Sequence, residues 1–197
     1  MSEQQQEGLR ARKRRQTQQR IVAAALSLFL ERGYEATTID AIADAAEIAR
    51  RTFFHYFDGK EAIIVALQGD AEDAFRLALA KVPKRWRPLR AIHAALRGMI
   101  ASYESEQAIA IDRFMRSTEL LRALKQASYE RNERELLAAL RERWPEADDE
   151  PGLRAAAMIG IGAIRLASDQ WSAEQARRPL EQYLDEQFAA IRRQVSA

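Results

Sequence analysis

The residues best suited to specific chemistry lie between Thr37 and Lys60, and their chemistry is that of binding a nucleic acid. Arg50 and Arg51 open a short predicted helix. A guanidinium fork at that position can donate paired hydrogen bonds to O6 and N7 of guanine. Thr52 follows them with a hydroxyl and a methyl group. Four further side chains of this stretch can donate hydrogen bonds to phosphate: Thr38, His55, Tyr56 and Lys60.

The same short helix is unusually aromatic. We expect Phe53 and Phe57 to lie in the core. For Phe54 a core position and a DNA contact are about evenly balanced, and on a DNA surface its ring could make only an apolar contact, such as to a thymine methyl. His55 is a poor candidate for a metal ligand, because no second His, Cys or carboxylate group shares its spacing.

A helix-turn-helix would position these side chains. Thr37 or Thr38 can cap a first helix, and Asp40 lies in its first turn, where the helix dipole favours negative charge. The apolar positions of that helix recur at helical spacing: Ile39, Ile42, Ala43 and Ala46. A turn around residues 47–49 then leads into the second helix. The pattern predicts a helix-turn-helix at about residues 38–57, whose second helix enters the major groove.

The sequence resembles the tetracycline-repressor (TetR) family of bacterial transcription regulators. The resemblance rests on these residues: Thr38-Ile39, Ile42-Ala43, Ala46, Arg51-Thr52-Phe53-Phe54, Tyr56-Phe57 and Lys60-Glu61, with Arg20-Ile21, Ala24-Ala25, Phe29 and Gly33-Tyr34 before them. Two positions depart from the family pattern. Glu47 stands where Gly is usual, so it must either adopt a positive φ or hold a different turn. Ala49 stands where Ser is frequent, and its side chain cannot cap the second helix.

The resemblance implies an all-α protein of about nine helices. It implies an N-terminal three-helix DNA-binding domain, which we place at residues 10–80, and a C-terminal domain for effector binding and dimerisation at residues 84–197. It also implies that Thr38, Tyr56 and Lys60 contact the DNA backbone, and that the last two helices form a four-helix dimer interface. An acyl thioester of coenzyme A is one effector that the family suggests.

Composition and charge agree with a DNA-binding protein. The 197 residues carry a net charge of +2, but six cations and two carboxylates within residues 1–20 place +4 there and leave −2 for the rest. The positive charge therefore lies beside the helix-turn-helix, where phosphates need it. A solvated charged face is the alternative explanation. There is no cysteine, and no apolar run approaches the ~20 residues that span a bilayer.

The remaining chain has helical periodicity without strand-like alternation. We expect residues 1–7 to be disordered and a long helix to run from about Leu9 to Arg32, ended by Gly33. One helix should run from Lys60 to about Val82 and link the two domains, with a break at the prolines near Pro83. The later helices are predicted at residues 89–103, 106–115, 118–144, 153–171 and 172–194, with a loop at 145–151 and a break in the last helix at Pro179.

The helix at residues 153–171 needs a packing partner. Ala156, Gly160 and Ala163 share one face and would permit close approach of another helix. We favour a homodimer through about residues 153–191, which would read a pseudo-palindromic operator. Burial inside the helix's own domain is the alternative explanation.

The central helices are the place where an effector pocket is expected. Its predicted walls are Met99, Tyr103 and Phe114, and its polar anchors are Arg113, Arg116 and Arg165. Such a mixture suits a small apolar or amphipathic ligand. Arg113 and Arg116 could bind a carboxylate or phosphate group of that ligand. Simple core packing explains the same residues equally directly.

The sequence thus predicts a cytoplasmic bacterial transcription regulator, nucleoid-associated when bound to DNA, and more specifically a homodimeric repressor released by a small effector. A constitutive, nucleoid-type DNA-binding protein is the second hypothesis. An enzyme is disfavoured by two histidines, no cysteine, no Gly-rich phosphate loop and no H-E-x-x-H. No cofactor, metal or membrane is expected. The effector, the operator and the regulated genes do not follow from the sequence.

Overall fold

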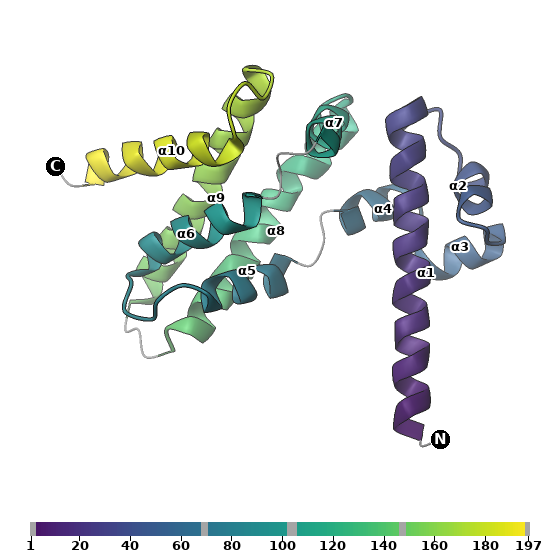
Figure 1. Cartoon of the computed structure of the whole chain (residues 1–197), viewed down its shortest axis with the longest axis horizontal. Coiled ribbons are helices and arrows are strands. Elements are labelled where there is room, and N and C mark those ends of the chain that lie inside the picture. The colour runs from purple at the N-terminus through teal and green to yellow at the C-terminus, as the bar shows by residue number, and fades with distance from the viewer. Residues whose placement is uncertain (1–2, 68–70, 102–105, 146–148, 196–197) are drawn as a thin grey trace. The chain divides into compact units, whose positions relative to one another are not determined.

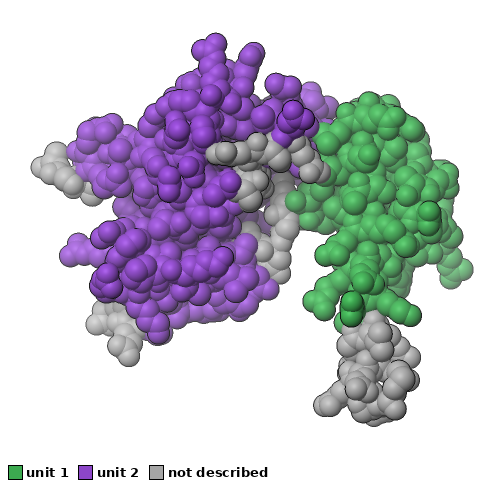
Figure 2. Space-filling view, in the orientation of Figure 1, with its two compact units in different colours: residues 1–69 green, residues 70–197 purple. Residues whose placement is uncertain are grey.

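The computed structural model describes every residue except 1–2, 68–70, 102–105, 146–148 and 196–197. The described residues form α-helices joined by turns and loops. Ten α-helices and no strand are present in these residues (Figure 1), so the predicted all-α fold is confirmed. None of these helices is long and apolar enough to cross a membrane. The chain forms two compact units, residues 1–69 and residues 70–197 (Figure 2), which we describe separately.

Four helices make up the first unit: α1 (Glu3–Arg32), α2 (Ile39–Ala45), α3 (Arg50–Tyr56) and α4 (Lys60–Leu67). The predicted inward stripe of α1 is buried, with Ile21, Ala25, Leu28 and Phe29 each less than 10% exposed. α1 packs against α2 and α4, and α2 packs against α3. Gly33 ends α1 at a φ of +82°, as its predicted C-cap role requires. The expected disorder is corrected for residues 3–7, because α1 begins at Glu3, and residues 1–2 lie outside the described residues.

The second unit contains six helices: α5 (Ala71–Ala80), α6 (Pro88–Ile100), α7 (Glu106–Met115), α8 (Glu119–Arg143), α9 (Glu150–Ala173) and α10 (Leu180–Val195). α9 lies at the centre of this bundle and packs against α6, α7, α8 and α10, while α5 packs against α6 and α8. The largest fully buried side chains here are Tyr183, Phe188, Leu79, Ile92, Leu121 and Leu136.

Several helix boundaries differ from those expected. The single helix expected over residues 60–82 is instead two helices, α4 and α5, on either side of residues 68–70, which lie outside the described residues. α5 is part of the second unit, so the division between the units lies at residues 69 and 70 rather than near Pro83. α9 begins at Glu150 inside the expected loop, because Asp149 caps it and Pro151 suits its first turn.

The small-residue face of α9 is used inside the unit. Ala156, Gly160 and Ala163 are all buried. A methyl group built on Gly160 would lie 2.5 Å from Cγ2 of Ile92 on α6 and 3.5 Å from Cδ2 of Leu136 on α8. The prediction that this face packs against a dimer partner is therefore corrected. The face is buried within its own domain, which was the alternative explanation. The face that carries Met158, Gly162 and Leu166 is the one left open.

Candidate nucleic-acid interface

The first helix of the helix-turn-helix is fixed by the two threonines before it, each in a different way. Oγ1 of Thr38 accepts a hydrogen bond from the backbone N–H of Ala41 at 3.1 Å, which confirms Thr38 as the cap of α2. Thr37 is buried and does not cap. Its hydroxyl donates to the carbonyl oxygen of Gly33 at 2.8 Å and ties α2 to the end of α1.

The turn between α2 and α3 accepts a glutamate in the left-handed region. Glu47 has a φ of +53°, so of the two conformations weighed for it the chain adopts the positive one. The backbone N–H of Ile48 donates to the carbonyl oxygen of Ala43 at 2.9 Å and closes the turn. Ala49 begins α3 without a side-chain cap, as expected. The geometry of the turn is therefore kept despite both departures from the family pattern.

α3 is anchored through two of its three phenylalanines. Phe53 is fully buried and Phe57 is 5% exposed, and their ring centroids lie 6.0 Å apart. Phe54 points to solvent and is 45% exposed, which resolves the even balance in favour of a surface position. Its exposed ring is therefore available for an apolar contact with another molecule.

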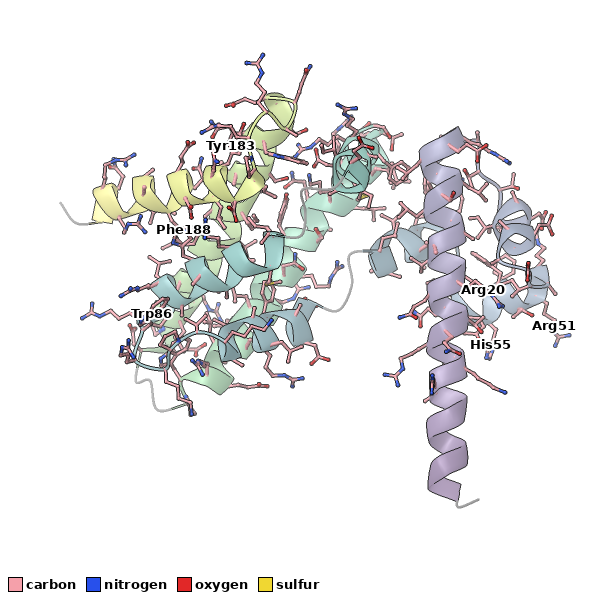
Figure 3. The ribbon with its side chains drawn as sticks, viewed as in Figure 1. Arg20, Arg51, His55, Trp86, Tyr183 and Phe188 are labelled. Atoms are coloured by element: carbon pink, nitrogen blue, oxygen red, sulfur yellow. The ribbon has the colours of Figure 1, made fainter. Side chains whose placement is uncertain are left out.

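The solvent-facing side of α3 carries the predicted base-reading groups. Arg50, Arg51 and His55 are exposed, and Thr52 and Tyr56 are half-buried. Arg51 and His55 project outward from α3 (Figure 3). Arg50 is held by Asp40 of α2, with Nη1 2.6 Å from both carboxylate oxygens, and its guanidinium carbon lies 5.7 Å from the centroid of the Phe54 ring. Arg51 forms no ion pair within the part of the chain that the structure describes.

Lys60 is already engaged within the unit. Its Nζ donates to the carbonyl oxygens of Tyr34 at 2.7 Å and Thr37 at 2.9 Å, and it lies 4.4 Å from the centroid of the Tyr34 ring. The neighbouring Glu61 accepts a hydrogen bond from the Tyr34 hydroxyl at 2.8 Å. Burial, and then this bond, raise the pKa of Tyr34, while a backbone hydrogen bond and the Tyr34 hydroxyl lower the pKa of Glu61. Lys60 thus has a structural role that sequence reasoning missed.

Basic side chains of α1 add positive charge to the same unit. Arg12, Lys13, Arg14, Arg15 and Arg20 are all exposed on the first two-thirds of the helix, and Arg20 is labelled in Figure 3. Exposed cations along a helix attract phosphates through long-range electrostatics. The side chain of Arg10 lies outside the described residues.

The described residues among those predicted for the effector pocket lie in different surroundings. Met99 lines a groove between α5 and α6, whereas Arg113 lines a separate hollow beside Trp171. Phe114 is buried and Arg165 is exposed. The shared pocket therefore stays a prediction, and Tyr103 lies outside the described residues.

Arg116, the remaining predicted anchor, belongs to a half-buried polar cluster that joins α7, α8 and α9. Its guanidinium donates to Asp112 and, at 2.9 Å, to Asp169, and Nζ of Lys125 lies 2.6 Å from Oδ1 of Asp112. Burial acts to raise the pKa of Asp112, but hydrogen bonds and charges from Lys125, Ser172 and Arg116 outweigh it and leave the pKa below its usual range. Burial lowers the pKa of Lys125 despite the opposing charge of Asp112. Arg116 is therefore occupied by protein groups.

Comparison with known proteins gives the same reading of the first unit. The family model described as "Bacterial regulatory proteins, tetR family" matches residues 21–67. The HTH-type transcriptional regulator TcmR of Streptomyces glaucescens is 37% identical over 105 residues, which cover 53% of this chain and 46% of that protein. The HTH-type transcriptional repressor KstR2 of Rhodococcus jostii is 46% identical over 52 residues, or 26% of either chain. The chain thus spans less than half the length of the curated relatives it matches.

Solved structures share the fold along nearly the whole chain. NalD, the secondary repressor of the MexAB-OprM multidrug efflux pump in Pseudomonas aeruginosa, superposes with a TM-score of 0.62 at 19% identity, over 92% of this chain and 96% of that one. FadR of Thermus thermophilus, a TetR-family repressor solved with lauroyl-CoA, superposes with a TM-score of 0.53 at 24% identity, over 87% and 91%. At these identities the likeness concerns the fold.

Proposed function

The chain belongs to the TetR family of bacterial transcriptional regulators, whose members bind DNA rather than catalyse reactions, and on that premise we propose that it is a repressor. In this proposal it binds a pseudo-palindromic operator as a homodimer and releases it when a small amphipathic effector binds. The observation that carries the proposal is the exposed side of α3, where Arg51, Phe54 and His55 face solvent while Phe53 anchors the helix in the core. Such a face can enter a major groove.

Six of the eight predicted DNA contacts have a role in this proposal. Arg51 reads a guanine, and Phe54 lies against a thymine methyl. Thr52, His55 and Tyr56 hydrogen-bond to bases or phosphates at the groove edge, and Thr38 lies where the backbone of the duplex passes. The exposed cations of α1 neutralise phosphates and make binding depend steeply on salt.

The open face of α9 supports dimerisation. Met158 is 56% exposed and Leu166 is 51% exposed, and Gly162 lies between them at helical spacing with nothing within 4 Å of a built methyl group. Two exposed large apolar side chains around a glycine suit the close approach of a second helix. We propose that this face, with α10 beside it, contacts the partner in a two-fold dimer.

Selection of binding sites from random duplexes tests the function. The expected result is an inverted repeat whose half-sites lie about one helical turn apart. Arg51→Ala should lose the selected sequence while the α1 cations keep weak binding to any duplex. Enrichment of no sequence by the full chain would instead support the constitutive, nucleoid-type hypothesis.

Analytical ultracentrifugation of the full chain and of Met158→Glu tests the dimer, because a buried charge on the open face should shift the sedimenting species toward monomer.

A further inference from the structure

The turn between α5 and α6, together with the first residues of α6, carries a dense group of cations that the helix-turn-helix does not use. Lys81, Lys84, Arg85, Arg87 and Arg90 lie within ten residues, all of them exposed, and residues 81–90 contain no acidic side chain. We call this segment the basic turn.

Each of these five cations lacks an ion pair with a carboxylate of the described residues. Elsewhere on this unit Arg76, Arg97, Arg141 and Arg178 are paired with acidic neighbours. Five like charges without such neutralisation create a strong local positive potential. The potential is available to an anion from outside the chain.

Trp86 organises the basic turn. Its ring is half-buried, and the guanidinium carbon of Arg90 lies 4.0 Å from its centroid, within the range of a cation–π contact. Arg85, Trp86, Arg87 and Arg90 together line a hollow of about 460 Å³. Three guanidinium groups around one hollow can bind phosphate oxygens through paired hydrogen bonds.

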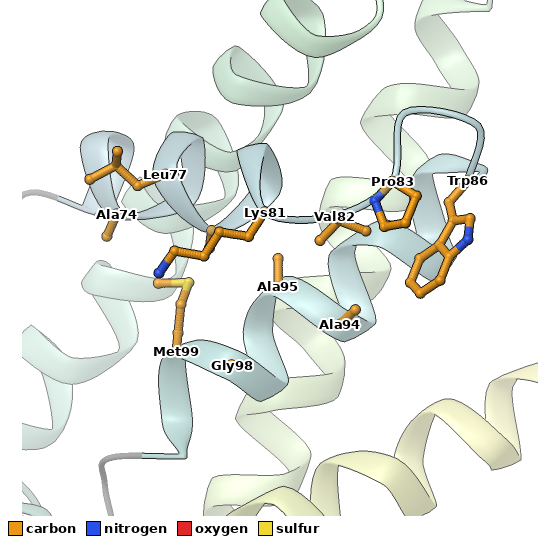
Figure 4. A pocket seen from close by; sticks show the side chains of 11 residues that line it. Ala74, Leu77, Lys81, Val82, Pro83, Trp86, Ala94, Ala95, Gly98 and Met99 are labelled. Carbon is orange, nitrogen blue, oxygen red and sulfur yellow. The ribbon is translucent and has the colours of Figure 1, made fainter.

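An apolar groove adjoins this hollow and shares Trp86 with it (Figure 4). The groove lies between α5 and α6 and has a volume of about 330 Å³. Lys81 is the single charged residue in its lining, and Leu77 at its edge is 62% exposed. Its remaining walls are Ala74, Ala78, Val82, Pro83, Trp86, Ala94, Ala95, Gly98 and Met99.

We propose that the basic turn and the groove form one binding site for an amphiphile whose head carries phosphate groups and whose tail is an alkyl chain. The guanidinium groups of Arg85, Arg87 and Arg90 bind the head, and the tail lies along the groove from Trp86 toward Met99. Charge complementarity selects the head, and removal of apolar surface from water favours the tail. As the site of the effector, this assignment rests on the proposed function.

Gly98 offers a variant that tests the tail site without disturbing the fold. It lies on α6 in the wall of the groove, and a methyl group built on it meets nothing within 4 Å. Gly98→Leu would place a side chain in the groove, and the change from glycine favours the helix. Arg87→Gln with Arg90→Gln tests the head site. Arg134→Gln removes an exposed cation from α8 and serves as the matched charge control.

Isothermal titration calorimetry of the full chain with dodecyl phosphate, below its micellar concentration, is the experiment. We expect dodecyl phosphate to bind at least tenfold more tightly than either inorganic phosphate or dodecanol. Gly98→Leu and the Arg87/Arg90 double variant should each weaken binding at least tenfold, and Arg134→Gln should leave it within twofold. Lauroyl-CoA should behave as dodecyl phosphate does.

Three outcomes overturn the proposal. If Gly98→Leu and the double variant bind dodecyl phosphate as strongly as the unchanged chain does, the ligand lies elsewhere. Equal binding of inorganic phosphate and dodecyl phosphate would leave the groove without a role. Binding to phosphatidylglycerol vesicles without binding to monomeric dodecyl phosphate would make the turn a membrane contact. Because the titration contains no DNA, a chain that binds the amphiphile as expected but selects no operator supports this site and refutes the proposed function.

Discussion

Arg50 and Asp40 join the two helices of the helix-turn-helix, with Nη1 of the arginine 2.6 Å from both carboxylate oxygens. Both side chains are more than half exposed, so in water the pair adds little to stability. The consequence of the pair is that the charge of Arg50 is balanced by that of Asp40. Arg50 reaches the solvent-facing side of α3 already neutralised, whereas Arg51 beside it is free of any ion pair with the described residues.

We therefore expect the two arginines to contribute unequally to DNA binding. Arg51→Ala should weaken binding to the selected operator by about 10- to 100-fold, because a paired contact with guanine is worth about 1–3 kcal/mol. Arg50→Ala should cost less than tenfold. Fluorescence anisotropy with a labelled operator at one salt concentration measures both. Equal losses in the two variants would contradict this assignment.

Asp40→Asn should strengthen DNA binding, because it removes a carboxylate beside the duplex and releases Arg50. The effect should be several-fold and should shrink as salt rises, since it is electrostatic. Asp44→Asn, on the same helix with its carboxylate outside any ion pair of the described residues, is the matched control for charge. A fall in affinity in Asp40→Asn would mean that the pair positions Arg50 for a base contact.

The turn at Glu47 stores conformational strain that a glycine would release. A residue with a Cβ at a φ of +53° costs about 1 kcal/mol relative to glycine. Glu47→Gly should therefore raise the free energy of unfolding of the chain by up to about 1 kcal/mol, because the greater flexibility of glycine in the unfolded chain offsets part of the gain. Glu47→Ala keeps the Cβ and should bring no such gain. Urea denaturation followed by circular dichroism measures both.

The first unit was predictable from the sequence because its signals are local. The threonine cap, the apolar spacing of α1 and α2 and the glycine after Arg32 each act within a few residues, and all appear in the structure. The role of Lys60 was not predictable in this way. It joins carbonyl groups 23 and 26 residues earlier in the chain, and a side-chain contact over that distance leaves no periodic signal.

The second unit was less predictable because its functional features depend on which helix faces which. Gly160 and Gly162 lie on different faces of α9, and sequence reasoning assigned to the dimer the face of Gly160, which is buried within the unit. Gly160 is small because Ile92 occupies the adjacent space, a contact over 68 residues. The groove beside Trp86 arises only when α5 and α6 pack together, although the five cations of the basic turn are visible in the sequence itself.

Gly160 and Gly162 of α9 should respond oppositely to alanine. Gly160→Ala should lower the free energy of unfolding by about 1–3 kcal/mol, because the added methyl group would lie 2.5 Å from Cγ2 of Ile92 and force the core to shift. Gly160→Ala should cost less in an Ile92→Ala background than in the parent chain, since Ile92→Ala removes the obstructing methyl group; Ile92→Ala alone is the reference of this double-mutant cycle. In the monomeric Met158→Glu background, Gly162→Ala meets open space and should stabilise α9 by about 1 kcal/mol. Equilibrium urea unfolding of these variants at one protein concentration tests this.

The carboxylate of Asp112 should make the stability of the second unit depend on pH. Its folded-state pKa is depressed, so the stability it contributes is fully present above the unfolded pKa of about 4 and is lost as the pH falls through the lower folded value. Asp112→Asn should cost about 1–3 kcal/mol at pH 7, since Lys125 and Arg116 lose their charged partner. That difference from the parent chain should narrow below pH 4, where the aspartate itself becomes neutral. Asp73→Asn removes an exposed carboxylate and should change little at either pH. A constant gap for Asp112→Asn between pH 3 and pH 7 would show that packing, rather than charge, is what this side chain contributes.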